Sequence, residues 1–298
     1  MWAKPGEFGL VRCATCSLAF LSPRPPREAI GFYYKDLYDG EGLVMEEKLQ
    51  HSAIARALNR FRLRDLVSRR RPSVGDRHLD VGCGVGAFLL RVSRDTGATG
   101  VGVDFDPAAI ESTLRHGRDA GLPIEAHRGT LAEQTFAPGE FATVSMIHFL
   151  EHSYDPRAEL VLARDLLASG GAIVVEVPSF RSVARRVFGA FWLPYLAPQH
   201  VTLFDRVSLK RALEESGFRD VRVGDSWAPF IWTTSFILWY HATLGGRSRF
   251  AENKAVKMLS LFLAFTLLPT LAVVDVLGSV VAARVGRGEH IRATAVKA

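Results

Sequence analysis

A glycine-rich segment carries the clearest chemical signal in the sequence. Residues 79–86 read LDVGCGVG, between an apolar run and a helical pattern. Glycines at such a turn let a ligand approach the backbone, which applies here to Gly82, Gly84 and Gly86. Asp104 ends the next apolar run, where its carboxylate can accept hydrogen bonds from both hydroxyls of a ribose. The segment therefore predicts a nucleotide-type site.

The glycine spacing alone leaves the ligand open. Gly82, Gly84 and Ala87 also satisfy the dinucleotide fingerprint, with Asp104 as its acid, so an NAD-dependent oxidoreductase is one alternative. Asp80 argues against it, because a carboxylate beside the helix N-terminus would repel a pyrophosphate. A ligand with an amino group would instead be attracted. A second alternative is an adaptor that keeps the fold without catalysis.

Alternating strand and helix patterns must position this site. Apolar runs alternate with helical segments, as expected for a parallel sheet covered on both faces. A helix over about 46–71 precedes them, and a final run alternates like a strand with one apolar face. The expected strands are 78–81, 99–103, 124–127, 142–147, 171–177, 221–223 and 291–296. The main expected helices begin near 86 and 107 and cover about 156–167 and 207–216.

Segment 79–86 resembles motif I of the class I S-adenosylmethionine-dependent methyltransferases. In that resemblance Asp104 is the ribose acid, and Phe105 covers the adenine. Thr130 and Leu131 match the loop at the adenine edge, where the family often has Asp at position 130. The resemblance implies S-adenosyl-L-methionine as cofactor. It also implies a Rossmann-like α/β fold with a mostly parallel seven-stranded sheet and an antiparallel last strand.

The likeness continues into the segment that would meet the acceptor. Residues 141–152 end in Leu-Glu-His and resemble the fourth-strand motif of the family, and 199–204 resemble its substrate-side element. Methyl transfer from a sulfonium is an in-line displacement that depends on alignment and desolvation. If the acceptor must lose a proton, His152 is the candidate base, because imidazole titrates near neutral pH. His200 is a second polar candidate, and His148 is expected beside the methionine moiety. Bracing of a loop is the alternative role for His152 and for His200.

No metal is predicted. In the ubiquinone-type O-methyltransferases that this motif resembles, acidic residues here help to bind a metal, and His148, Glu151 and His152 have spacing that could supply three ligands. Three residues on one strand-to-loop segment rarely converge unaided. Cys13 and Cys16 have the spacing of one zinc knuckle, as in relatives with an N-terminal zinc ribbon. Those relatives carry two such pairs, a structural zinc needs four ligands, and this chain begins just before the second pair.

Charge and composition limit the classes of molecule that the protein is expected to bind. The net charge is +6 and the pI about 9.4, which suits nucleic acid or an anionic membrane surface. The arginines over 56–71 lack the interleaved aromatic residues that stack bases, so no nucleic-acid partner is predicted. The three cysteines give no disulfide framework, and residues 1–20 show no secretory signal. We therefore expect a cytoplasmic protein with a small-molecule acceptor; the sequence predicts no oligomeric state.

The C-terminal region is strongly apolar. Residues 258–274 carry no charge, and the apolar run resumes after Asp275. Its length would allow a membrane span, but one span would place the last strand on the wrong side. We predict a hairpin bent near Pro269, with basic residues at both ends, that contacts the cytoplasmic face of the membrane peripherally. A buried helical cap or a dimer interface is the alternative. With membrane contact, the acceptor would be amphipathic or lipid-linked.

The expected organisation has four parts. They are an irregular N-terminal segment over 1–45 with the remnant cysteine pair, a methyltransferase core over 46–227, an apolar helical insertion over 228–285, and the final strand of the core within 286–298.

Overall fold

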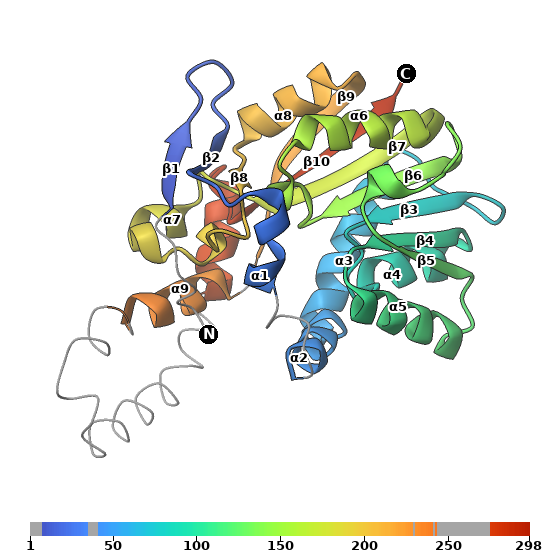
Figure 1. Cartoon of the computed structure of the whole chain (residues 1–298), viewed down its shortest axis with the longest axis horizontal. Coiled ribbons are helices and arrows are strands. Elements are labelled where there is room, and N and C mark those ends of the chain that lie inside the picture. The colour runs from blue at the N-terminus through green and yellow to red at the C-terminus, as the bar shows by residue number, and fades with distance from the viewer. Residues whose placement is uncertain (1–7, 35–40, 229, 241, 243–274) are drawn as a thin grey trace.

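A seven-stranded sheet forms the centre of the computed structural model, which describes residues 8–34, 41–228, 230–240, 242 and 275–298 (Figure 1). The last strand, β10, is antiparallel to both of its neighbours, and the other paired strands are parallel. The prediction of a mostly parallel sheet with an antiparallel last strand is confirmed. In spatial order the strands are β5 (Ile124–Arg128), β4 (Thr99–Asp104), β3 (Arg77–Val81), β6 (Phe141–Ile147), β7 (Leu167–Pro178), β10 (His290–Lys297) and β9 (Phe218–Ser226).

Helices cover both faces of the sheet, as the alternation along β7 requires. Successive side chains of a strand point to opposite faces. Ala172 and Val174 pack against α3 (Ala53–Val67) and α4 (Ala87–Thr96). Ile173 and Val175 belong to the larger core cluster, which includes residues of α6 (Pro156–Leu166) and α8 (Arg206–Glu215). A further helix, α5 (Pro107–Asp119), follows β4.

The single helix expected over 46–71 is wrong in its extent. The structure has two helices there, α2 (Glu41–Gln50) and α3, separated at His51 and Ser52. The Ser52 hydroxyl accepts a hydrogen bond from the Ala55 N–H at 3.2 Å and caps α3. Such a cap supplies an acceptor for an N–H that has no partner within the helix, so a new helix begins there.

The N-terminal segment is not irregular throughout, which corrects the expectation for 1–45. Strands β1 (Gly9–Arg12) and β2 (Ala19–Ser22) pair antiparallel, and β2 also pairs with the short strand β8 (Thr202–Leu203). The alternation in β2 covers only four residues, and its partner β8 lies far along the chain. Short local patterns therefore do not reveal this sheet. The turn between β1 and β2 carries Cys13 and Cys16, both free thiols, and α1 (Gly31–Tyr34) follows.

The two described ends of the apolar insertion pack together. They are α9 (Ile231–Tyr240) and a helix over 275–284. The Asp275 carboxylate accepts from the Thr233 N–H at 3.2 Å, and the Ser279 hydroxyl donates to the Ala228 carbonyl at 3.2 Å. Residues 243–274, with the predicted bend at Pro269, lie outside the described residues. Within the described ranges, no helix has the length and apolar character needed to cross a membrane.

A buried carboxylate joins three elements of the fold. Glu176 of β7 is 1% exposed. Its Oε1 accepts from Arg62 Nε of α3 at 3.0 Å, and its Oε2 accepts from Arg292 Nε of β10 at 2.6 Å. These ion pairs connect α3, which precedes the sheet in the sequence, with the neighbouring strands β7 and β10.

Replacing Glu176 should destabilise the fold strongly. Glu176→Gln keeps the shape but leaves the buried Arg62 without its carboxylate and Arg292 with Asp65 alone, so the free energy of unfolding should fall by about 3 kcal/mol or more. Urea denaturation followed by circular dichroism measures this. The control is Glu215→Gln, which removes an exposed pair with Arg211 on α8 and should leave the free energy of unfolding nearly unchanged. Equal losses in the two variants would contradict the role given to Glu176.

Candidate functional site

The glycine loop after β3 combines two tightly packed positions with one open position. Gly82, Gly84 and Gly86 have positive φ angles of 70°, 51° and 78°. A Cβ at Gly82 would lie 2.7 Å from the Phe149 ring, and one at Gly86 would lie 2.8 Å from the Thr113 side chain. A Cβ at Gly84 would meet nothing within 4 Å. Packing therefore requires the outer two glycines, and Gly84 leaves a cradle in which a ligand can approach the backbone.

Asp104 at the end of β4 holds the loops around this cradle. Its Oδ2 accepts from the Gly84 N–H at 2.9 Å and its Oδ1 from the Asp106 N–H at 3.0 Å. Its carbonyl accepts from the Gly129 N–H at 2.9 Å, which brings the loop after β5 alongside. Burial raises the pKa of Asp104. A carboxylate oxygen can accept more than one hydrogen bond, so Asp104 retains capacity for a pair of ribose hydroxyls.

Asp80 lies buried in β3, close to the same loop. The Ser145 hydroxyl of β6 donates to its Oδ1 at 2.5 Å. Burial raises the pKa of Asp80 to about 7. A nearby ammonium group would stabilise the ionised form, which fits a ligand with an amino group and disfavours a pyrophosphate. The cradle at Gly84 and the carboxylates of Asp80 and Asp104 fit the polar groups of S-adenosyl-L-methionine.

The other predicted donor-site residues occupy the same edge of the sheet. Phe105 follows Asp104, is 49% exposed, and packs edge-on against Tyr34 with ring centroids 5.4 Å apart. The Thr130 N–H donates to Glu133 Oε2 at 2.7 Å. Leu131 is buried in the core, so its side chain supports the loop. Contact of these residues with adenine stays a prediction.

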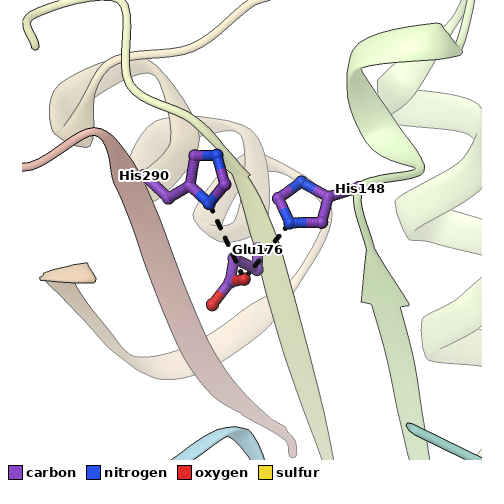
Figure 2. A group of neighbouring side chains, drawn as sticks. All are labelled: His148, Glu176 and His290. Carbon is purple, nitrogen blue, oxygen red and sulfur yellow. Dashed lines mark ion pairs between the residues drawn. The ribbon is translucent and has the colours of Figure 1, made fainter. Parts of the chain in front are cut away.

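His148 belongs to a cluster with Glu176 and His290 (Figure 2). Its Nε2 lies 3.3 Å from Glu176 Oε1, and its Nδ1 lies 3.4 Å from Glu151 Oε1. Burial lowers the pKa of His148, but these two carboxylates outweigh it and raise the pKa to about 9. Burial and the charge of His148 lower the pKa of His290 to about 3. Because Glu176 already pairs with Arg62 and Arg292, this cluster is poorly suited to a cation.

His152 and His200 form a second, uncharged pair. Their ring centroids are 4.6 Å apart. His152 Nδ1 lies 3.1 Å from the Gln199 carbonyl, and His200 Nδ1 lies 2.8 Å from the Pro194 carbonyl. A carbonyl only accepts, so His200 Nδ1 carries hydrogen and its Nε2 keeps a lone pair. His152 Nδ1 also lies 2.7 Å from the Tyr34 hydroxyl, which can either donate or accept. Burial lowers the pKa of His152; burial and the proximity of His152 lower the pKa of His200 to about 4.

Tyr34 connects this pair with the donor side. Its hydroxyl lies 2.7 Å from His152 Nδ1, and its ring contacts Phe105. The structure therefore brings the predicted base His152 to the side of the predicted adenine-covering residue. His200 joins them, whereas His148 turns toward β7.

Glu151 lies between the two histidine clusters. It is 1% exposed, and neither carboxylate oxygen accepts a hydrogen bond of ordinary geometry from the described residues. The ligand atoms of Glu151, His152 and His200 lie within 4.8 Å of one another, so this group, and not His148 with Glu151 and His152, could hold a cation. The sequence prediction of a site without metal stays a prediction.

Four residues of the site escaped the sequence analysis: Tyr34, Arg62, Glu176 and His290. Glu176 gave a usable signal, because a charged residue inside the apolar run 171–177 must have a buried partner. Arg62 lay within a run of arginines that resembles an exposed helix face. Tyr34 lay in a segment expected to be irregular.

Comparisons with known proteins identify a methyltransferase domain in this chain. A family model described as a methyltransferase domain matches residues 45–223. A ubiquinone biosynthesis O-methyltransferase of Xylella fastidiosa is 35% identical over 149 residues, which cover 49% of this chain and 56% of that protein. One from Cereibacter sphaeroides is 37% identical over 131 residues, which cover 43% and 52%. The chain thus spans about half the length of the curated relatives it matches.

Solved structures share the fold. Phosphoethanolamine N-methyltransferase 2 of Haemonchus contortus, in complex with S-adenosyl-L-methionine, has a TM-score of 0.57 at 15% identity and covers 94% of this chain and 61% of that one. Geranyl diphosphate C-methyltransferase of Streptomyces coelicolor has a TM-score of 0.53 at 14% identity and covers 82% and 76%. At these identities the likeness concerns the fold alone.

Asp104 should control the affinity for the nucleoside. Asp104→Asn removes the charge that strengthens hydrogen bonds to two ribose hydroxyls, so the Kd for S-adenosylhomocysteine should rise by about tenfold or more. Isothermal titration calorimetry measures this. The control is Glu111→Gln, which removes the same charge from an exposed residue of α5. An unchanged Kd in a folded Asp104 variant would place the ribose elsewhere.

Proposed function

Since the chain belongs to the methyltransferase-domain family, we propose that it transfers a methyl group from S-adenosyl-L-methionine to a small-molecule acceptor. The observation that carries the proposal is the position of Tyr34. This residue contacts Phe105 on the donor side and the imidazole of His152 on the other. The donor loop and a neutral proton acceptor are thereby adjacent, as a displacement followed by proton removal requires.

Each residue on the donor side is proposed to bind a different part of the cofactor. Asp104 would accept the ribose hydroxyls, and Phe105 would cover the adenine beside the loop of Thr130 and Leu131. Asp80 would attract the amino group, and His148 would lie beside the methionine moiety. When bound, the cofactor supplies an electrophilic methyl group on a sulfonium.

His152 is the proposed base. Its neutral imidazole has one lone pair, which can take the proton that the acceptor loses, and the buried carboxylate of Glu151 stabilises the resulting imidazolium. His200 presents an Nε2 lone pair that can hold an acceptor hydroxyl in place. The displacement itself needs no metal.

We propose an amphipathic or lipid-linked acceptor, delivered from the cytoplasmic face of a membrane. The composition of the 228–285 insertion supports this, since its uncharged stretch is long enough to enter one leaflet and return. The curated relatives are named for the biosynthesis of ubiquinone, which is a lipid-soluble quinone. In this division residues 46–227 and the final strand within 286–298 form the catalytic core. Nucleic acid has no part in it.

His152 should remain uncharged at neutral pH. Because burial lowers its pKa, the basic form persists below the ordinary imidazole pKa of about 6.5, and activity that depends on it should decline only below that pH. An NMR titration of the histidine ring signals measures this, with His152→Gln to assign the resonance. A pKa above that value would contradict the base role.

Radiolabelled methyl groups test the proposed activity directly. Purified protein and labelled S-adenosyl-L-methionine should transfer label to the organic-soluble fraction of a membrane extract and not to its aqueous fraction. His152→Gln should lower the rate by roughly a hundredfold. The partly exposed His127→Gln serves as control. Label in the aqueous fraction alone would refute the amphipathic acceptor, and no transfer by a protein that binds S-adenosylhomocysteine would favour the adaptor.

A further inference from the structure

An open cavity of about 410 Å³ lies outside the donor and histidine sites and is lined mainly by arginines. They come from three distant segments: the end of β1, the residues in and before α7 (Val183–Phe188), and the approach to β10. We call this cavity the arginine pocket; its guanidinium groups belong to Arg12, Arg181, Arg185, Arg186 and Arg287.

The arginine pocket has a strong excess of positive charge. Arg12 pairs with Asp205 Oδ2 at 3.0 Å, and Arg181 Nε lies 3.3 Å from the same oxygen. Asp205 is buried and also caps α8 by accepting the Ser208 N–H at 2.8 Å. Neither Arg186 nor Arg287 has a carboxylate partner among the residues that the structure describes. Five guanidinium groups against one carboxylate leave four positive charges, and their repulsion favours a bound anion.

One arginine of the pocket is already oriented. Arg185 lies over the Phe180 ring, with its guanidinium carbon 4.1 Å from the ring centroid, and donates to the Phe180 carbonyl and to the Tyr195 hydroxyl. A guanidinium that is fixed in this way loses less side-chain entropy when it binds an oxyanion. The planar fork of arginine matches the paired oxygens of phosphate.

An apolar ridge borders the arginine pocket. Leu277, Val281 and Val285 are spaced by four residues along and just beyond the helix over 275–284, so they share one face. They are 61%, 58% and 63% exposed. Val285 directly precedes Gly286, which lines the pocket together with Arg287. The surface thus places hydrocarbon contact next to a concentrated positive charge.

We propose that the arginine pocket binds the phosphate group of an amphipathic phosphate ester, with the hydrocarbon part of the ligand along the apolar ridge. Phosphate carries up to two negative charges near neutral pH and presents several acceptor oxygens, which match the excess of guanidinium groups. The ridge selects an ester with an apolar chain over a small polar phosphate. This proposal does not depend on methyl transfer, since none of the residues that line the pocket belongs to the donor loop or to the histidine clusters.

Inorganic pyrophosphate probes the pocket itself. Full-length protein should bind it in a calorimetric titration, and Arg186→Gln/Arg287→Gln should weaken binding by about tenfold. These two arginines have no role in the donor site, so the Kd for S-adenosylhomocysteine should stay within about twofold and show that the variant is folded. The matched control is Arg94→Gln/Arg118→Gln, which removes two exposed arginines from α4 and α5 and should leave pyrophosphate binding unchanged. No binding by the natural protein, or equal weakening in both double variants, would overturn the proposal.

Vesicles distinguish the sources of the phosphate. Sedimentation with phosphatidylcholine vesicles that contain phosphatidic acid, and loss of it in the Arg186/Arg287 variant alone, would assign the phosphate to a membrane lipid. Pyrophosphate binding without any sedimentation would assign it to an ester that dissolves in water, and would support the pocket equally. Sedimentation that both double variants lose alike would reflect net charge only and would overturn the pocket as the lipid site.

Discussion

The buried carboxylate of Glu176 is the constraint on which the rest of the structure depends. A charge in the centre of a sheet is stable only with partners, and here they come from α3, from β10 and from His148 at the end of β6. The same contacts that join the fold therefore fix the loop after β6. The His148 N–H donates to the Glu176 carbonyl at 2.9 Å, and the backbone there takes a positive φ of 55°. This contact therefore also helps to position Glu151 and His152, which lie three and four residues further along the chain.

The histidines of the site fall into two kinds according to the groups that surround them. His148 faces two carboxylates, which raise its pKa to about 9, whereas His152 and His200 contact backbone carbonyls, and burial lowers their pKa values. An imidazole that is neutral near pH 7 suits acceptance of a proton. Tyr34 then links the neutral pair to Phe105, which directly follows Asp104, so the proposed binding and proton-transfer residues lie next to each other.

The sequence predicted those features that depend on local patterns. The glycine turn, Asp104 at its strand end, and the order of strands and helices all follow from spacing and periodicity within short windows, and the structure places them as expected in the sheet. Features that join distant segments could not be predicted from the sequence. The pairing of β2 with β8, the ion pairs of Glu176 and the contact of Tyr34 with His152 have no local period. The arginines of α3 illustrate the limit, since Arg62 is buried and paired although its neighbours in sequence resemble a solvated helix face.

The central claim is that the edge formed by β3 and β4 binds the nucleoside of S-adenosyl-L-methionine, and titration calorimetry of the natural protein tests it most directly. S-adenosylhomocysteine and NAD are the two ligands to compare, because the glycine spacing alone suits both. The account predicts micromolar binding of S-adenosylhomocysteine and none of NAD, since Asp80 repels a pyrophosphate. Binding of NAD, or of neither ligand by the folded protein, would contradict it.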